Sequence, residues 1–328
     1  MRKLGIIIIL VICSCETEFY PYDASVKPIP IVFGMIDTND SIHSIRLTKT
    51  FSGTENAYKL AKDTLNLLYD SVRMIIECLD GNLKVIDSLI FHKTYFIPPS
   101  SGIFNTGKGW YYVSTDKFPS ADSFVLFRLK VWIYDSGDTI VSRNIYTYST
   151  SDRTQILSPS KISQYISVYN ESVTTIAYRG HDICGIKLRL HYFEIRNDTK
   201  TDKSIEEFWL DTNGSGAFRL TPARLFMFIR NTIPENPDVD FRIFSGLDIF
   251  SYAAPKAFVI YNQLFNTDRS FYSDITFFET PYSDITNGYG LFYEYTKDSI
   301  ISLKFDEKTL DSLASGQYTK KLKFVSYQ

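Results

Sequence analysis

The chain has 328 residues, with 35 Lys and Arg against 37 Asp and Glu, and its net charge is −2. This balance excludes the basic excess typical of nucleic-acid-binding proteins, and the length is sufficient for two domains. The 25 Phe and 23 Tyr favour the pleated, half-buried surfaces of β-sheets.

The N-terminus has the layout of a secretory signal. Arg2 and Lys3 precede an apolar run from Leu4 to Ile12, which is broken only by Gly5. The run is about half the roughly 20 residues that a helix needs to cross a bilayer, so we do not expect a stable transmembrane anchor.

The run ends in Ile12, Cys13, Ser14 and Cys15, which match the box of a bacterial lipoprotein signal. We predict a signal peptide at residues 1–14 and lipidation of Cys15, because Cys13 as acceptor would put the bulky Ile12 where the peptidase needs a small side chain. Several acyl chains of the palmitate type on one residue give stable anchoring. The alternative is an ordinary secretory signal with incidental cysteines. Removal of residues 1–14 leaves 328 − 14 = 314 residues with 33 basic and 37 acidic side chains, a net charge of −4.

Residues 15–29 are polar, aromatic and proline-containing, and they are typical of a tether. We predict a β-sandwich domain over residues 30–150. Its clearest strands are residues 70–80 and 82–93, joined by a DGN turn, and the alternating segment 123–135. A further strand follows at residues 139–149.

A polar segment with Pro159 separates this domain from a second β-rich domain, predicted over residues 155–328. In GIKLRLHY (185–192) every second residue is apolar, which predicts a strand with one buried face. Three stretches have helical character: 55–68, the segment that begins at Thr221 and Pro222, and 250–265. The sequence thus predicts a mainly β protein with two or three helices.

After Cys15 only Cys78 and Cys184 remain. In an oxidising envelope these two cysteines are able to form one disulfide that closes a large loop. Two separate buried thiols are an alternative to which we give equal weight. We expect neither a metal site nor a cofactor, because there is no CxxC pair or Cys/His cluster.

Two segments resemble a family of surface lipoproteins of Bacteroidota-type bacteria that is recorded only as a domain of unknown function. The early segment IVFGMIDTNDSIHSIRLTKTFSG (31–53) has the family's V-x-G-x-I strand, and the late segment SDITNGYGLF (283–292) has Asn287, Gly288, Gly290 and Phe292. The family's usual double glycine is replaced by Asn287 and Gly288. The resemblance implies an immunoglobulin-like N-terminal module and a link to outer-membrane nutrient transporters, but no established activity.

Two more features agree with this setting. Glu16 and Glu18 resemble the acidic tag that sends such lipoproteins to the outer face of the outer membrane, and a solvated linker is the alternative. A second feature is a triplet of Asp, followed by Ser or Thr, followed by an aliphatic residue. This triplet resembles the O-glycosylation signal of these bacteria. It occurs seven times, against roughly two expected from composition. Turns that precede strands also generate this triplet, and we expect two or three sites at most to be modified. The seven candidates are Ser41, Thr64, Ser71, Ser88, Thr139, Ser299 and Ser312.

Candidate catalytic groups have simpler structural explanations. His181, Asp182 and Cys184 lie at the start of a predicted strand, where alternation would point His181 away from Asp182. The acidic pairs Glu206–Glu207 and Asp238–Asp240 are expected on solvated faces. The aromatic segments WYYVS (110–114) and FWLD (208–211) are able to form a carbohydrate platform, but core packing is the default interpretation.

These observations predict a non-enzymatic, lipid-anchored protein of the outer membrane that faces the cell exterior. We expect a binding or accessory component beside a nutrient transporter, with a glycan or peptide as ligand and no nucleic acid. The alternatives are a surface hydrolase that acts on glycans or peptides, and a purely structural envelope or adhesion protein.

Overall fold

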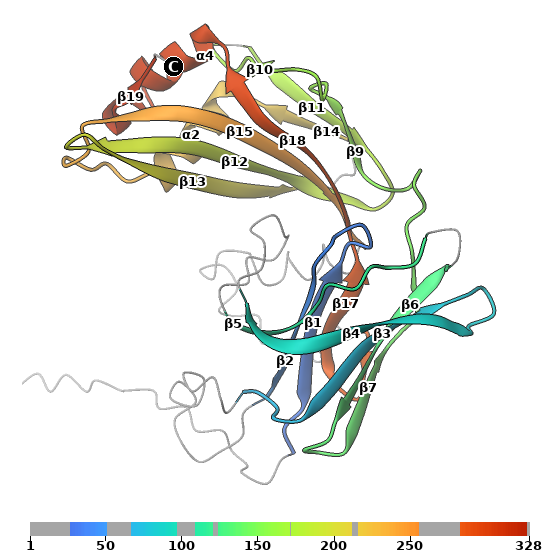
Figure 1. Cartoon of the computed structure of the whole chain (residues 1–328). Coiled ribbons are helices and arrows are strands. Elements are labelled where there is room, and N and C mark those ends of the chain that lie inside the picture. The colour runs from blue at the N-terminus through green and yellow to red at the C-terminus, as the bar shows by residue number, and fades with distance from the viewer. Residues whose placement is uncertain are drawn as a thin grey trace, which may run out of the picture.

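The computed structural model describes residues 27–50, 67–96, 109–120, 124–170, 172–211, 216–255 and 283–326. These residues form a mainly β protein, as the sequence predicts, and its strands gather in two lobes (Figure 1). The N-terminal lobe comprises β1–β8, β16 and β17. The C-terminal lobe comprises β9–β15, β18, β19 and the two α-helices found among the described residues, α2 (Pro222–Thr232) and α4 (Glu307–Ser315).

The N-terminal lobe is one ten-stranded sheet in the order β16-β7-β6-β3-β4-β5-β2-β1-β17, with β8 beside β6. It folds around a single core because β4 pairs with β3 along its first half and with β5 from His92 onward. The two ends of the order, β16 and β17, are consecutive in the chain. The strands are β1 (Pro30–Ile36), β2 (His43–Lys49), β3 (Val72–Leu79), β4 (Val85–Phe96), β5 (Gly109–Ser114), β6 (Leu126–Ile133), β7 (Asp138–Ser142), β8 (Ile145–Tyr146), β16 (Ile285–Thr286) and β17 (Tyr289–Glu294).

The C-terminal lobe has a six-stranded sheet in the order β10-β18-β15-β12-β13, with β19 beside β15, and a three-stranded sheet in the order β14-β11-β9. A short 3₁₀ helix, η1 (Lys320–Leu322), follows α4. The strands are β9 (Gln155–Ser158), β10 (Tyr165–Ile166), β11 (Thr174–Arg179), β12 (Ile183–Arg196), β13 (Thr199–Leu210), β14 (Ala217–Leu220), β15 (Phe241–Ala253), β18 (Thr296–Phe305) and β19 (Phe324–Val325).

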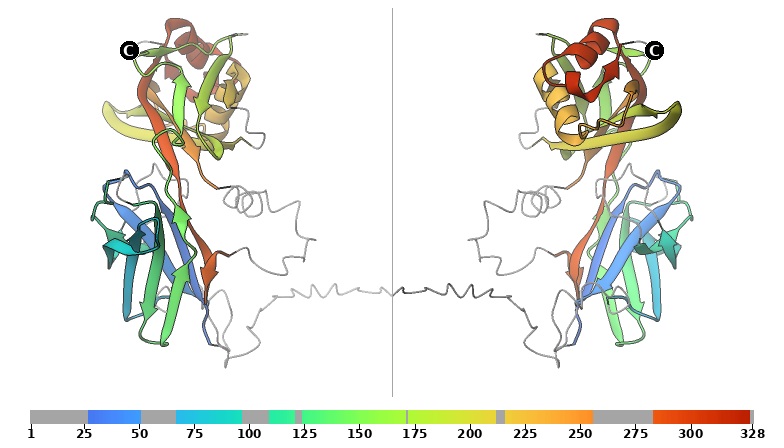
Figure 2. Two further views of the ribbon diagram at one scale, coloured as in Figure 1. Left: turned by 90° about the vertical axis from the view of Figure 1, so that its right-hand side faces the viewer. Right: turned by 90° about the vertical axis from the view of Figure 1, so that its left-hand side faces the viewer.

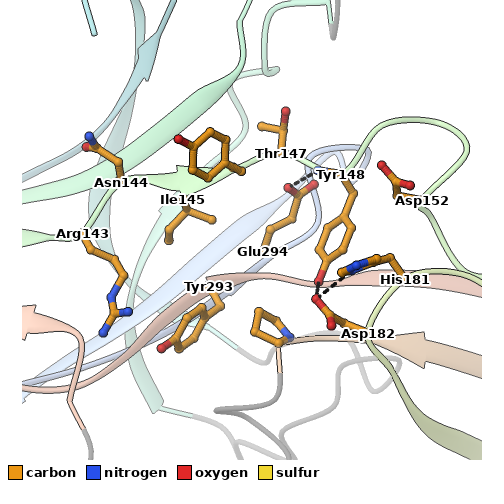
Figure 3. A pocket seen from close by; sticks show the side chains of 12 residues that line it. Arg143, Asn144, Ile145, Thr147, Tyr148, Asp152, His181, Asp182, Tyr293 and Glu294 are labelled. Carbon is orange, nitrogen blue, oxygen red and sulfur yellow. Dashed lines mark hydrogen bonds and ion pairs between the residues drawn. The ribbon is translucent and has the colours of Figure 1, made fainter. Parts of the chain in front are cut away.

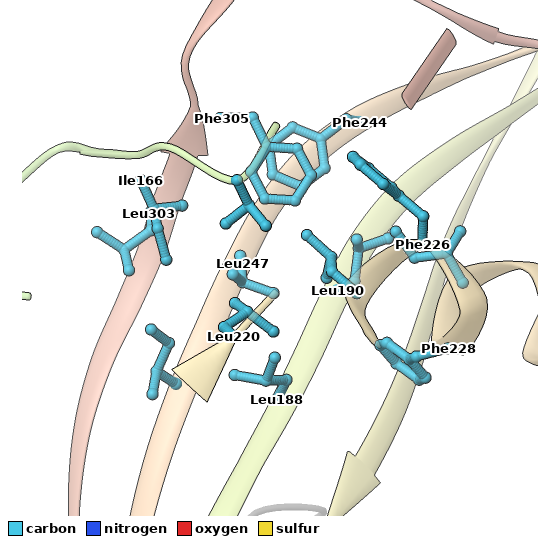
Figure 4. Close-up of a cluster of buried hydrophobic side chains, with 14 of the residues drawn as sticks. Ile166, Leu188, Leu190, Leu220, Phe226, Phe228, Phe244, Leu247, Leu303 and Phe305 are labelled. Atoms are coloured by element: carbon cyan, nitrogen blue, oxygen red, sulfur yellow. The ribbon is translucent and has the colours of Figure 1, made fainter. Parts of the chain in front are cut away.

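The core of the C-terminal lobe lies between its two sheets and α2 (Figure 4). Leu188 and Leu190 of β12 point into it, which confirms the predicted alternation, and they face Leu220 of β14. The predicted start of α2 is also confirmed, since the Thr221 hydroxyl accepts a hydrogen bond from the Arg224 N–H at 3.2 Å. Its buried side chains include Phe226 and Phe228.

The predicted helix at residues 250–265 is wrong at its start. Residues 250–253 are the last residues of β15, and every residue from Gly246 to Ala253 is buried. A run that is buried on both faces has no strand-like alternation, so periodicity alone does not separate it from a helix. Residues 256–265 lie outside the described residues, as does nearly all of the predicted helix at 55–68.

The strands of the N-terminal lobe come from both sides of the predicted boundary near residue 150. After β8 the chain enters the C-terminal lobe, and it returns to the N-terminal lobe only at β16 and β17. It then passes straight from β17 into β18, a continuous ribbon that runs through both lobes (Figure 2). The immunoglobulin-like class of the N-terminal lobe and the exact division into domains stay predictions.

Candidate ligand-binding pocket between the lobes

The two segments that carry the family resemblance lie side by side. Strand β1 pairs in parallel with β17, and Val32 is opposite Gly290 while Gly34 is opposite Phe292. A Cβ on Gly290 would lie 1.8 Å from the Val32 carbonyl oxygen, and a Cβ on Gly34 would lie 2.7 Å from the Phe292 ring. The glycines are therefore needed for close packing of the two strands, so the two motifs have a structural explanation.

The end of β17 carries a buried acid at the junction of the lobes. Glu294 is 1% exposed, and its Oε1 accepts a hydrogen bond from the Thr38 hydroxyl at 2.9 Å. Its Oε2 accepts one from the Tyr148 backbone N–H, also at 2.9 Å. Arg153 lies 3.6 Å from Glu294 and forms a second ion pair with Asp37. This network ties the β1–β2 turn and the segment between β8 and β9 to the end of β17.

Burial raises the pKa of Glu294 to about 7, because the desolvation of its carboxyl outweighs the hydrogen bonds from Tyr148 and Thr38 and the charge of Arg153. The carboxyl group of Asp37 adds to the increase. Glu294 therefore changes its charge near neutral pH, at a point where the lobes meet.

A further set of contacts joins the lobes, and another fixes the chain on the C-terminal side of the junction. Lys297 of β18 pairs with Asp40 of the β1–β2 turn at 2.7 Å, and the Tyr295 hydroxyl donates to the same carboxylate at 3.2 Å. Within the C-terminal lobe, the Thr154 N–H donates to the Thr296 hydroxyl at 3.0 Å. The chain segments that cross the junction are thus fixed by polar contacts that are buried at Thr154 and half-buried at Lys297 and Asp40.

A pocket of about 510 Å³ opens beside this network (Figure 3). Its walls come from both lobes: β7–β8 and β17 on one side, and the segments before β9, before β12 and after β15 on the other. The lining residues are Arg143, Asn144, Ile145, Tyr146, Thr147, Tyr148, Asp152, His181, Asp182, Pro255, Tyr293 and Glu294. The size lies within the range of small-molecule sites, about 300–1,000 Å³.

His181 and Asp182 meet in this pocket, so the prediction that they point apart is wrong. The His181 Nδ1 lies 3.0 Å from Asp182 Oδ2, and the Tyr148 hydroxyl donates to the same oxygen at 3.2 Å. The reason is that both residues precede β12 and that Asp182 has a φ of 53°, so strand alternation does not apply. Backbone bonds hold this turn in place: the His181 N–H donates to Asp152 O, and the Ala254 N–H donates to Asp182 O.

The sequence left open whether Cys78 and Cys184 form a disulfide or are separate thiols, and the structure describes the side chain of Cys78 alone. It is a free thiol with no exposed surface, and burial raises its pKa to about 12. This agrees with a separate buried thiol at Cys78. The side chain of Cys184, and Cys15, Glu16 and Glu18 entirely, lie outside the described residues.

The candidate glycosylation sites occupy different environments. Ser41, Ser71 and Ser88 are exposed, whereas Thr139, Ser299 and Ser312 are half-buried and Thr64 lies outside the described residues. Ser71 directly precedes β3, Ser41 lies two residues before β2, and Thr139 is the second residue of β7, as a turn-forming role predicts. Ser88 and Ser299 lie within strands and Ser312 within α4, so that role does not explain them.

The other candidate residues are not brought together into a site. Glu206 pairs with Lys187 and Arg189, while burial raises the pKa of Glu207. Asp240 accepts a hydrogen bond from Asn197 N–H. Among the described residues, no group of three or more His, Cys, Asp or Glu is placed to hold a metal ion.

The two aromatic segments divide between core and surface. Tyr111 and Tyr112 are buried, whereas Trp110 is partly exposed and meets Tyr95 edge-on at 5.4 Å. Trp209 stacks on Phe218 at 5.1 Å. Core packing is therefore correct for Tyr111 and Tyr112, and Trp110 lies outside it.

Sequence reasoning missed Arg153 and Glu294, which are far apart in the chain. The one available signal was an acid within the apolar run GLFYEY (290–295), since a charged side chain in a buried strand needs a partner.

Neither the family models nor the curated proteins contain a match to this chain. In the described parts of the chain no helix has both the length and the apolar character needed to cross a membrane.

Proposed function

We propose that the protein is an outer-membrane lipoprotein that faces the cell exterior and acts as a binding or accessory component beside a nutrient transporter. The box that ends at Cys15 and the acids Glu16 and Glu18 support the location. The observation that carries the binding role is the pocket between the lobes, because it combines aromatic walls with polar groups from separate chain segments.

Binding is a better account of this pocket than hydrolysis. Glu294 is the lining acid whose pKa is raised to about 7, but both of its oxygens accept hydrogen bonds from the protein. A general acid must instead reach the leaving group of its substrate. The hydrogen bonds of Glu294 therefore favour a structural role for its carboxyl group and support the binding role over the surface hydrolase.

The N-terminal lobe supports the finer proposal of an immunoglobulin-like sandwich. Strand β4 passes from one half of the sheet to the other, and the first strand pairs with the last strand of the lobe. A strand that changes sheets is one of the ways in which β-sandwiches turn their corners.

Metabolic labelling with a palmitate analogue tests the anchor. We expect the protein from its own host to take up the label, Cys15→Ala to lose it, and Cys13→Ala to keep it as the matched control. Retention of the label by Cys15→Ala would exclude the predicted acceptor.

Protease treatment of intact cells tests the orientation, and purification from host membranes tests the partner. We expect the native protein to be cleaved from outside and the double variant Glu16→Ala, Glu18→Ala to be protected while it remains lipidated. Co-purification with a transporter barrel is the expected second result. A lipidated monomer that recovers no partner and binds neither glycans nor peptides would contradict the proposed role.

A further inference from the structure

The pocket between the lobes has a cationic side. Arg143 lies there beside Tyr293, at the opposite side of the view from Asp182 and His181 (Figure 3). Its side chain is exposed and makes no hydrogen bond or ion pair with any residue that the structure describes. A guanidinium group in this position is available to bind a carboxylate, for which its planar pair of N–H donors is well suited.

The other side of the pocket is anionic. Asp182 uses Oδ2 to accept from Tyr148 and His181, while its Oδ1 makes no hydrogen bond within the described residues. Asp152 adds a second carboxylate to the same side. Arg153 does not neutralise these acids, because it is engaged with Asp37 and Glu294. This side therefore favours an ammonium group.

The rest of the lining includes apolar rings and an amide group. The rings are those of Tyr146, Tyr293 and Pro255, and the amide is that of Asn144, which lies on the same side of the pocket as Arg143 (Figure 3). Tyr146 is 74% exposed, so its ring is open to a ligand. Apolar rings and an amide group suit the side chains and backbone of a peptide.

We propose that this pocket binds a short peptide with free ends, its carboxylate on Arg143 and its amino group on Asp182. The inference rests on the proposed binding function and narrows the ligand from a glycan or peptide to a peptide. A neutral oligosaccharide would bring no charge to either side chain. Arg143 would then keep only solvent and, among the described residues, the carboxylate of Asp284 within electrostatic range, and Asp182 only solvent, Tyr148 and His181.

The test uses the full protein purified in detergent from host membranes. The probes are three pooled tetrapeptide libraries: one with free ends, one with C-terminal amides and one with N-terminal acetyl groups. Equilibrium dialysis with mass spectrometry identifies retained sequences, and calorimetry measures their Kd. We expect the free-ended peptides to bind about tenfold or more tightly than either blocked form.

Two variants assign the ends of the peptide. Arg143→Gln should abolish the preference for a free carboxylate but keep the preference for a free amine, and Asp182→Asn should do the reverse. Arg46→Gln on β2 and Asp202→Asn on β13 change exposed charges away from the pocket and should keep both preferences. Equal thermal stability of the four variants excludes misfolding as the cause.

Equal affinity of the native protein for free-ended and blocked peptides would overturn the proposal. Binding of maltoheptaose or xylohexaose that Arg143→Gln leaves unchanged would also overturn it, while the binding function itself would stand. If neither peptides nor these oligosaccharides bind, the peptide proposal and the ligand-binding role both fail. The anchor and the transporter partner are tested separately by labelling and co-purification.

Discussion

Gly290 has both a restricted backbone and no space for a side chain. Its φ is 124°, and a Cβ would lie 1.8 Å from the carbonyl oxygen of Val32 in the adjacent strand. We expect Gly290→Ala to lower the free energy of unfolding by about 3 kcal/mol or more, because β1 and β17 would have to separate. Urea unfolding followed by circular dichroism measures the loss.

The matched control is Gly81→Ala in the β3–β4 turn, where no atom lies within 4 Å of the added carbon. It should change the stability by less than about 0.5 kcal/mol. Equal effects of the two substitutions would show that close packing of β1 on β17 is not what requires Gly290.

Glu294 should make the protein less stable as the pH rises. Its pKa is about 7 in the folded protein against 4.5 in the reference state, so the folded state binds more protons between these values. Its contribution is complete below pH 4.5 and is lost as the pH rises through 7. The full difference corresponds to about 3 kcal/mol.

Glu294→Gln should remove most of this dependence, because the amide keeps one oxygen for Tyr148 N–H and offers an N–H to the Thr38 hydroxyl. The stability of the variant relative to the native protein should rise by about 2.5 kcal/mol between pH 5 and pH 8 in urea titrations, since part of the change occurs below pH 5. The comparison cancels the effects of Asp284, whose pKa burial raises to about 6, and of His43, whose pKa burial lowers. A difference that is constant with pH would contradict the assignment.

For single residues, the sequence indicated which side chains would be important but not which distant residues they would contact. The Thr221 cap was predictable because its partner is three residues away. Arg153, Asp37 and Glu294 come from three distant segments, and their meeting depends on the β1–β17 pairing. The positions of His181 and Asp182 depend on a positive φ at Asp182, which strand alternation does not anticipate.

Among the secondary-structure elements, α4 depends on one capping side chain. Asp306 Oδ1 accepts a hydrogen bond from Thr309 N–H at 2.9 Å, and its Oδ2 accepts one from the Ser167 hydroxyl at 2.6 Å. We expect Asp306→Ala to lower the stability by about 1–2 kcal/mol, since both donors lose their acceptor. Thermal unfolding measures the effect.

Asp311→Ala in the same helix is the control, because Asp311 is exposed and its side chain makes no hydrogen bond or ion pair within the described residues. It should leave the melting temperature nearly unchanged. A loss as large as that of Asp306→Ala would point to a general sensitivity of α4 rather than to its cap.

Strands with one buried face were predictable, and strands with two were not. In β12 the apolar residues alternate from Ile186 to Tyr192, and these side chains are buried. The polar face of the same strand is less exposed than the pattern indicates: Lys187 is buried against Phe250 and Tyr252 of β15. The last residues of β15 are likewise buried on both faces, and for that reason their sequence pattern was interpreted as a helix.

For the whole molecule, the topology predicts that the N-terminal lobe does not fold from its own end of the chain. A fragment of residues 27–150 lacks β16 and β17, so β1 would have an unpaired edge and Phe292 would be missing from the core. We expect this fragment to unfold without a cooperative transition. Addition of a synthetic peptide of residues 283–295 should restore one, as measured by near-ultraviolet circular dichroism during thermal unfolding.

A peptide with Gly290→Ala is the matched control and should restore little or no cooperative unfolding. A fragment of residues 27–150 that melts sharply by itself would show instead that β16 and β17 are dispensable, and that the predicted boundary near residue 150 marks an independent domain.

The pairing of β1 with β17 also sets the order of events when the chain is made. Strand β1 is synthesised among the first segments, but the neighbour that completes its sheet emerges only after the strands of the C-terminal lobe up to β15. During that interval β1 offers open hydrogen-bonding groups to any other extended chain nearby. A newly made molecule is therefore most vulnerable to aggregation until its last fifty residues arrive, and a helper that shields this strand would act in that period.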